Sequence, residues 1–124
     1  MHPTSDWIRT WRRFQPKAEA IFDVATGRRW NWDRLAGESL RWATRLQKEG
    51  VNVGDRVVLL AQNRIDTLAL LFACAEVGAI LAPLNWRVSD AEIHWQLEHC
   101  RPALCLQEDS QAGRIAGALR LEEG

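Results

Sequence analysis

The sequence predicts an α/β fold in which a parallel sheet is built from alternating strands and helices. Residues 57–61 and 79–84 are apolar without alternation, which is typical of strands covered on both faces and predicts strands near 56–62 and 79–84. The segment between them has apolar residues at helical spacing: Ile65, Leu68, Phe72 and Ala75. We expect Leu68 and Phe72 to be buried against the sheet, and Gly78 to end the helix. Such a βαβ unit has a right-handed crossover, which makes its strands parallel.

A third strand extends this unit. Residues 89–92, Ser-Asp-Ala-Glu, form a capping box that opens a second helix. That helix carries Ile93 and Leu97 at positions i and i+4, and Pro102 follows its end. Residues 103–107 then read as a short apolar strand. The expected arrangement is therefore β-α-β-α-β, with three parallel strands in one sheet.

A hairpin and a long helix precede this sheet. Residues 20–24 and 28–30 are expected to form the hairpin, since Gly27 allows the positive φ that a tight turn needs. Asn31 then caps a helix that runs to about Glu49. The apolar stripe of that helix consists of Leu35, Trp42, Ala43 and Leu46.

Residues 4–14 are predicted to form a first short helix, which Ser5 caps and Pro16 ends. Its apolar residues are expected on one side: Trp7, Ile8, Trp11 and Phe14. Its arginines lie elsewhere on the surface: Arg9, Arg12 and Arg13. Two interpretations are open: the helix docks on the domain, which we favour, or it lies at a membrane interface. About three turns are too few for strong membrane binding by the helix alone.

Beyond Glu108 the chain becomes polar and offers less pattern. It ends with apolar residues at the spacing of a helical turn: Ile115, Leu119 and Leu121. No internal repeat or low-complexity tract is visible.

The composition is that of a soluble globular protein, with 124 residues, 47% hydrophobic and 26% charged. The formal net charge is zero, so nothing indicates general nucleic-acid binding. The charge is unevenly spread, since residues 1–62 carry 11 basic and 7 acidic side chains and residues 63–124 carry 5 and 9. We interpret these as two ordinary solvated faces.

A membrane span and a secretory signal are both disfavoured. Residues 68–84 form an apolar run with only Glu76 charged, but the run is short and Gly78 divides it into helix-like and strand-like halves. The first residues have neither the basic nor the apolar segment of a signal peptide. We therefore expect a cytoplasmic protein without a transmembrane segment, with peripheral membrane association left open.

Three cysteines without CxxC spacing, Cys74, Cys100 and Cys105, indicate a reducing compartment rather than a disulfide framework. Cys74 lies among apolar residues and reads as a small core residue. Cys100, Cys105 and His99 offer three zinc donors, but no fourth ligand is evident. We therefore predict no metal site.

No catalytic motif is present in the sequence: it has no GxSxG, GxGxxG or GxxxxGK[ST] pattern, and none of its histidines pairs with a nucleophile. The most motif-like segment is the Pro-Leu-Asn-Trp-Arg turn at 83–87, which follows a parallel strand at the edge where α/β sheets bind ligands. Asn85 and Arg87 are the two candidate ligand contacts. The favoured alternative is structural: Asn85 bonds its own turn, and Arg87 bonds carbonyls or pairs with Asp90.

Several segments, taken in order, resemble the N-terminal region of the AMP-forming acyl-CoA synthetases, a branch of the adenylate-forming enzymes. They are Gly-Asp-Arg-Val at 54–57, Asn63, Val-Gly-Ala at 77–79 and Pro-Leu-Asn-Trp-Arg at 83–87. The resemblance extends roughly from residue 11 to residue 107. Their order and spacing together are more specific than any one of them.

The resemblance implies an activity for a longer protein. The family activates a carboxylic acid with ATP to an acyl-adenylate, releases pyrophosphate, and transfers the acyl group to coenzyme A. Its phosphate loop, its adenine and ribose motifs and its mobile C-terminal domain lie downstream of the matched region. Residues 1–124 are therefore expected to be the N-terminal part of an AMP-binding domain, a partial domain of a larger enzyme.

The resemblance also sets the expected substrate and partners. We expect a fatty or other hydrophobic acid as substrate, with ATP, Mg and CoA in the parent enzyme and the rest of the synthetase chain as partner. The alternatives are a stand-alone, non-catalytic α/β interaction module and an adenylation domain that feeds a carrier protein. For this chain alone we expect no catalytic residue, no bound cofactor and no activity, and we expect its exposed sheet edge to favour self-association.

Overall fold

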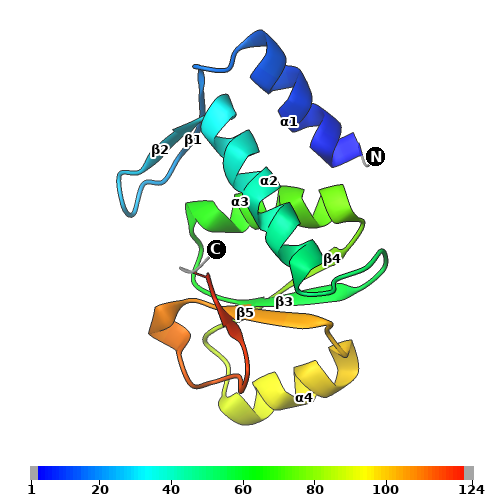
Figure 1. Ribbon diagram of the computed structural model, residues 1–124. Coiled ribbons are helices and arrows are strands. Elements are labelled where there is room, and N and C mark those ends of the chain that lie inside the picture. The colour runs from blue at the N-terminus through cyan, green and yellow to red at the C-terminus, as the bar shows by residue number, and fades with distance from the viewer. Residues whose placement is uncertain (1–2, 122–124) are drawn as a thin grey trace.

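The computed structural model describes residues 3–121, with side chains from residue 7 onward, and has a sheet between helical layers (Figure 1). The elements in chain order are α1 (Pro3–Phe14), β1 (Glu19–Phe22), β2 (Arg29–Asn31), α2 (Trp32–Lys48), β3 (Arg56–Leu60), α3 (Ile65–Val77), β4 (Ile80–Leu84), α4 (Asp90–Cys100), β5 (Leu104–Gln107), the 3-10 turn η1 (Asp109–Gln111) and β6 (Leu119–Arg120). Helices α2 and α3 cover one face of the sheet and α4 covers the other. Helix α1 lies outside α2 and α3.

The four-stranded sheet is parallel, with the strand order β4-β3-β5-β6. In the central strand β3, Val58 lies opposite Ala82 of β4 and Cys105 of β5. The β1–β2 hairpin is separate and antiparallel. The predicted fold class, with three parallel strands and an N-terminal hairpin, is therefore confirmed.

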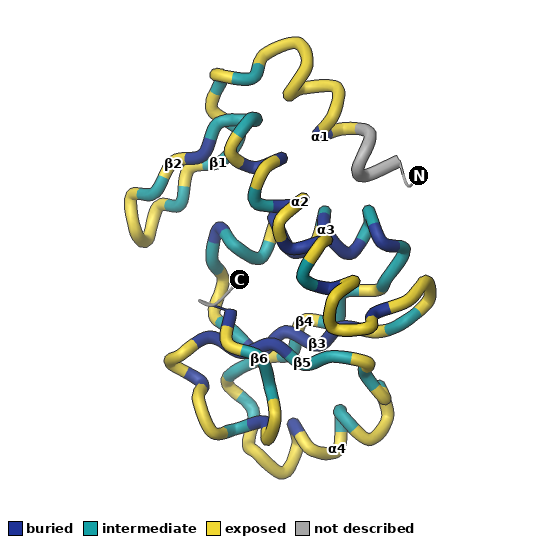
Figure 2. The backbone as a smooth tube through the Cα atoms, viewed as in Figure 1, coloured by how far each residue is buried: buried dark blue, intermediate teal, exposed yellow. Residues whose placement is uncertain are grey.

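Strand β3 divides the core between the two faces of the sheet because its side chains alternate. Val57 and Leu59 pack into the larger cluster under α2 and α3, whereas Val58 and Leu60 pack into a smaller one with Ile93 of α4. These four side chains are at most 2% exposed, which explains the unbroken apolar run in the sequence. Figure 2 shows the resulting band of burial through β3 and the facing side of α2.

Local capping residues behave as the sequence predicts. Asn31 Oδ1 accepts from Arg34 N at 2.7 Å, and Ser89 Oγ accepts from Glu92 N at 3.2 Å. Gly78 ends α3 in the left-handed region at φ 79°. The predicted stripe of α2 is also buried: Leu35, Trp42, Ala43 and Leu46.

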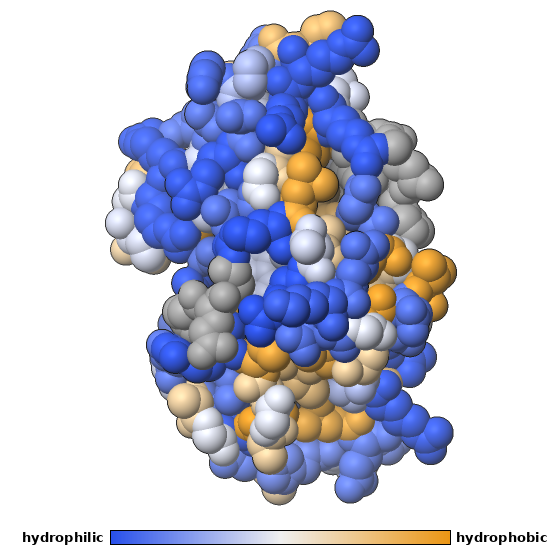
Figure 3. Space-filling model, in the orientation of Figure 1, coloured by the Kyte–Doolittle hydropathy of each residue, from blue (hydrophilic) through white to orange (hydrophobic). Residues whose placement is uncertain are grey.

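The predicted buried face of α3 is wrong in part. Leu68 is 39% exposed, and Phe72 is only partly buried. The residues that α3 buries are Ile65, Ala69, Leu70, Ala73, Cys74 and Val77. Apolar residues surround this helix on nearly every side, so periodicity does not single out one face; contact with both the sheet and α2 decides it. Phe72 instead lines a cleft of about 100 Å³ with Ile8 and Leu40, and Figure 3 shows apolar surface there between hydrophilic rims.

The first helix also differs from the prediction. It begins at Pro3, so Ser5 lies inside the first turn rather than at the cap. Ile8 is buried, but the three aromatic residues are exposed: Trp7, Trp11 and Phe14. The helix therefore docks on the domain, as we favoured, but with its aromatic side turned outward.

The predicted C-terminal helical turn is wrong. Leu119 lies in the short strand β6, which pairs parallel to β5 with Leu119 opposite Leu106. Ile115 and Leu121 are buried beside this strand. A segment of two residues has too little sequence pattern to predict a strand. Strand β6 forms because the edge of β5 supplies its hydrogen-bonding partner.

Candidate functional site

The candidate site lies at the edge of the sheet where the parallel strands end. Strands β3, β4 and β5 end at Leu60, Leu84 and Gln107, and the loops that follow emerge on this edge. These loops carry Arg64, the turn at 85–89 and the segment at 108–118. Open α/β sheets bind ligands at this edge because helix N-termini and loop side chains converge there.

The turn at 85–89 is held by its own backbone and by Asn85. Asn85 Oδ1 accepts from Arg87 N at 3.0 Å, and Asn85 O accepts from Val88 N at 3.3 Å. The amide oxygen of Asn85 is therefore occupied within the turn, which is the structural role that the sequence favoured.

The Arg87 side chain does not make the pair with Asp90 that the structural interpretation of this turn predicted. Its side chain is exposed and stacks over Trp86, with the guanidinium carbon 5.1 Å from the ring centroid. Asp90 pairs with Arg114 instead, since Arg114 Nε lies 2.7 Å from Asp90 Oδ1. Within residues 7–121 Arg87 makes no ion pair, so its charge faces solvent beside the turn.

Arg114 is the residue at this edge that the sequence analysis missed. It donates to Trp86 O at 2.7 Å, to Val88 O at 2.6 Å and to Gln111 Oε1 at 2.8 Å. Because Arg114 follows β5 by seven residues and its partners follow β4, no spacing rule in the sequence links them. One guanidinium thus fixes both sides of the turn that presents Asn85 and Arg87.

A second polar cluster surrounds Glu108, which is buried at 7% exposure. Its carboxylate accepts from Gln62 N at 3.1 Å and from Ser110 Oγ, and it lies 3.8 Å from Arg64 Nη1. Glu108 N also donates to Leu60 O at 3.1 Å. The hydrogen-bonding capacity of the carboxylate is thus met by groups that follow β3 and β5, and these bonds hold the two strand ends together.

An ion-pair chain continues from this cluster to the hairpin. Asp66 Oδ2 accepts from Arg64 Nε at 2.8 Å and from Arg28 Nη1 at 2.9 Å. Burial opposes the charged form of Asp66, but the hydrogen bonds and charges of Arg28 and Arg64 prevail and lower its pKa. These ion pairs join the turn of the hairpin, the start of α3 and the segment that follows β5.

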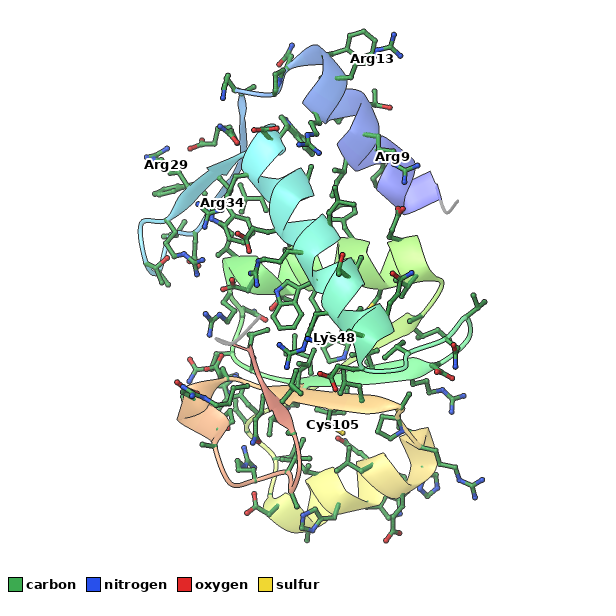
Figure 4. All side chains as sticks on the ribbon, viewed as in Figure 1. Arg9, Arg13, Arg29, Arg34, Lys48 and Cys105 are labelled. Atoms are coloured by element: carbon green, nitrogen blue, oxygen red, sulfur yellow. The ribbon has the colours of Figure 1, made fainter. Side chains whose placement is uncertain are left out.

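The thiols and histidines that the structure describes do not form a metal-binding group. His99 stacks on Trp95, with ring centroids 4.0 Å apart, and its Nδ1 lies 3.3 Å from Trp95 O. Cys105 lies on the α4 side of β5 (Figure 4), where burial and the nearby Cys100 raise its pKa. Burial raises the pKa of Cys74 to about 12, as expected of a core thiol. In the part of the chain that the structure describes, no group of three or more His, Cys, Asp or Glu could hold a metal ion.

Among the residues described, this edge therefore presents the exposed guanidinium of Arg87 beside a turn held by Arg114, whereas Arg64, Asp90 and Glu108 lie in ion pairs. The family model described as "AMP-binding enzyme" matches residues 8–123. The chain belongs to this family. The resemblance to the AMP-forming, adenylate-forming enzymes, in their N-terminal segment, is thus confirmed.

Relatives with named activities support the assignment. The chain is 36% identical over 111 residues to an indoleacetate–CoA ligase of Aromatoleum aromaticum, covering 90% of this chain and 21% of that protein. It is 31% identical over 104 residues to a feruloyl-CoA synthase of an Amycolatopsis species, covering 84% and 21%. It spans 14%, 21% and 22% of the first three curated relatives that it matches.

Solved structures agree with this fold. A putative long-chain fatty-acid CoA ligase from Rhodopseudomonas palustris superposes with a TM-score of 0.83 at 32% identity, covering 91% of this chain and 28% of that one. The N-terminal domain of FACL13 from Mycobacterium tuberculosis superposes with a TM-score of 0.86 at 24% identity, covering 93% and 29%. At 24% identity, the similarity to the FACL13 domain shows a shared fold alone.

Proposed function

We propose that this chain is the N-terminal segment of an enzyme that activates a fatty or other hydrophobic carboxylic acid with ATP. The enzyme forms an acyl-adenylate with release of pyrophosphate and then transfers the acyl group to coenzyme A. The family match over residues 8–123 is the observation that carries the proposal. The named relatives add that acids with a large apolar body recur among the proteins similar to this chain.

The role that we propose for this segment is structural support of the catalytic edge. Its parallel sheet presents the turn at 85–89, and Arg114 holds that turn through two backbone carbonyls. Catalysis by positioning requires supports of this kind, because small displacements of reacting groups are costly. The residues described offer no carboxylate cluster for Mg, so we assign no step through a metal to this chain.

One relative favours a second candidate acceptor of the acyl group, a carrier protein. The chain is 33% identical over 95 residues to a fatty acid–[acyl-carrier-protein] ligase of Streptomyces coeruleorubidus, covering 77% of this chain and 18% of that protein. An adenylation enzyme that loads a carrier protein is therefore the second candidate. Both candidates share the adenylation step and differ only in the thiol that accepts the acyl group.

The test uses the longest product of the gene that encodes this chain. Purified product is incubated with ATP, labelled pyrophosphate and a panel of fatty, aryl and short polar acids. We expect acid-dependent exchange that is strongest with apolar acids, followed by thioester formation with coenzyme A. Exchange with no acid on the panel, or a reading frame that stops after residue 124, would support the stand-alone interaction module instead.

A further inference from the structure

Helix α1 is attached to the domain by two of its arginines and one apolar residue. Arg9 Nη2 lies 2.6 Å from Glu76 Oε1 on α3, and Arg12 Nε lies 3.0 Å from Asp33 Oδ1 on α2. Among the α1 side chains that the structure describes, from residue 7 onward, Ile8 is the buried apolar one, at 6% exposure. The domain-facing side of this helix thus combines the buried Ile8 with two interhelical ion pairs.

The outward side carries the aromatic residues of α1. Trp7 is 64% exposed, Trp11 43% and Phe14 70%. Positions 7, 11 and 14 follow the i, i+4, i+7 spacing of one helical stripe, which we call the aromatic stripe. Trp11 also stacks on Trp32 of α2, with ring centroids 5.8 Å apart, and this contact anchors the stripe to the domain. An exposed stripe of large aromatic side chains marks an interaction surface.

Positive charge adjoins the aromatic stripe. Arg13 lies over the Phe14 ring, 5.7 Å from its centroid, and neither Arg13 nor Lys17 forms an ion pair in the part of the chain described. Figure 4 shows Arg13 at the outer end of α1. Residues 1–62, which include α1, the hairpin and α2, carry a net charge of +4, against −4 for residues 63–124. The excess of positive charge in residues 1–62 favours a negatively charged partner over a neutral one.

We propose that the aromatic stripe of α1, with Arg13 and Lys17, binds the surface of a bilayer that contains anionic lipids. Trp and Phe rings insert at the level of the headgroups, and the two cations contact anionic headgroups. The partner is assigned from the exposed aromatic rings of α1 together with two exposed cations: Arg13, which lies over the Phe14 ring, and Lys17, three residues beyond the end of the helix. The proposal is independent of the proposed enzymatic function.

Attachment to the domain removes the objection that α1 is short. An isolated helix of 12 residues is marginal in water and must fold when it binds. Here the ion pairs of Arg9 and Arg12 and the burial of Ile8 hold the helix before any membrane is met. Binding then incurs little of the ordering cost that weakens short free peptides.

The experiment is co-sedimentation of the 124-residue chain with vesicles, using phosphatidylcholine alone or mixed with phosphatidylglycerol, at low and high salt. We expect binding to the anionic vesicles, weakened by salt. The double variant Trp7→Ala/Phe14→Ala should lower the partition constant by at least about tenfold, because two aromatic side chains leave the interface. Arg13→Gln/Lys17→Gln should reduce binding to anionic vesicles and abolish much of its salt dependence.

Trp95→Ala is the matched control, since Trp95 is 57% exposed on α4, at the opposite end of the molecule (Figure 1). It should leave vesicle binding unchanged. Urea midpoints of all variants verify that the fold is retained, and Phe14→Ala alone replaces the double variant if that one unfolds. Binding that is equal on neutral vesicles, absent, or insensitive to the stripe variants overturns the proposal. So does a dimer that the stripe variants dissociate in the absence of lipid binding.

Discussion

Arg114 and Asp90 form an ion pair at 2.7 Å across 24 residues of sequence, and the same guanidinium donates to the carbonyl oxygens of Trp86 and Val88. Asp90 is 62% exposed, whereas Arg114 is 20% exposed, so the carbonyl bonds contribute more than the surface pair. Arg114 therefore fixes the turn at 85–89 from the loop that follows β5.

Arg114→Met should lower the free energy of unfolding by about 1–3 kcal/mol, because partly buried carbonyls lose their donors. Arg87→Met is the matched control on the same turn: Arg87 is exposed, so its loss should stay within about 0.5 kcal/mol. Urea titration monitored by circular dichroism measures both values. Equal losses in the two variants would contradict the role assigned to Arg114.

Leu70 and Leu68 provide a test of which face α3 buries. Leu70 is fully buried and Leu68 is 39% exposed, although both lie in the same apolar run. Leu70→Ala should cost about 2–5 kcal/mol, as is usual for a packed core site. Leu68→Ala should cost less than about 1 kcal/mol, since its side chain already meets solvent. A larger loss from Leu68→Ala in the same urea titration would restore the face that the sequence predicted.

The sequence predicted the elements whose signals are local. Asn31 and Ser89 cap their helices, Gly78 ends α3, and the unbroken apolar run of β3 indicates burial on both faces. Each of these depends on residues within about one turn of one another. The class of the fold follows from their order.

Features that depend on distant partners could not be predicted. The buried face of α3 is chosen by α2 and the sheet together, and β6 exists because β5 offers an edge. The aromatic side of α1 faces outward because Arg9 and Arg12 find acidic partners on α3 and α2. Within the candidate site, Asn85 was placed correctly in its turn, but the partner of Asp90 was not.

Asp66 should make stability depend on pH in the acid range. Its pKa in the folded state is lowered below its unfolded value, which is about 3.9 for a free Asp. The charged carboxylate therefore stabilises the fold above that unfolded pKa, and the contribution is lost as pH falls through the folded pKa.

Asp66→Asn should therefore cost roughly 1–3 kcal/mol at pH 7, because Arg28 and Arg64 lose a common partner. The difference in unfolding free energy between this variant and the unsubstituted chain should shrink as pH falls below about 4. Urea midpoints at several pH values measure this. Glu19→Gln, which breaks an exposed pair with Arg29, should cost less at pH 7. A difference that grows in acid would exclude a lowered pKa.

Strand β4 should mediate self-association of the 124-residue chain. Within residues 3–121 it pairs with β3 alone, and Ile80 on this edge strand is 53% exposed. An uncovered edge with apolar side chains is a template for pairing with another copy. Sedimentation velocity should show oligomers that increase with concentration, and Ile80→Lys should reduce them, because a charge on an edge strand opposes pairing. An unsubstituted 124-residue chain that stays monomeric at high concentration would contradict this.

The 124-residue chain alone should neither bind ATP appreciably nor catalyse acid-dependent ATP–pyrophosphate exchange. Adenylate formation needs several donors around the triphosphate and a cation at the developing charge, all held in position. At the candidate edge, the Asn85 amide oxygen is used by its own turn, and Arg87 offers a single exposed guanidinium. One solvated cation does not hold a triphosphate against the nucleophile. Labelled-pyrophosphate exchange with a mock-purified control measures the activity. Exchange above that control, abolished by Arg87→Ala or Asn85→Ala, would make the turn an active site rather than a support.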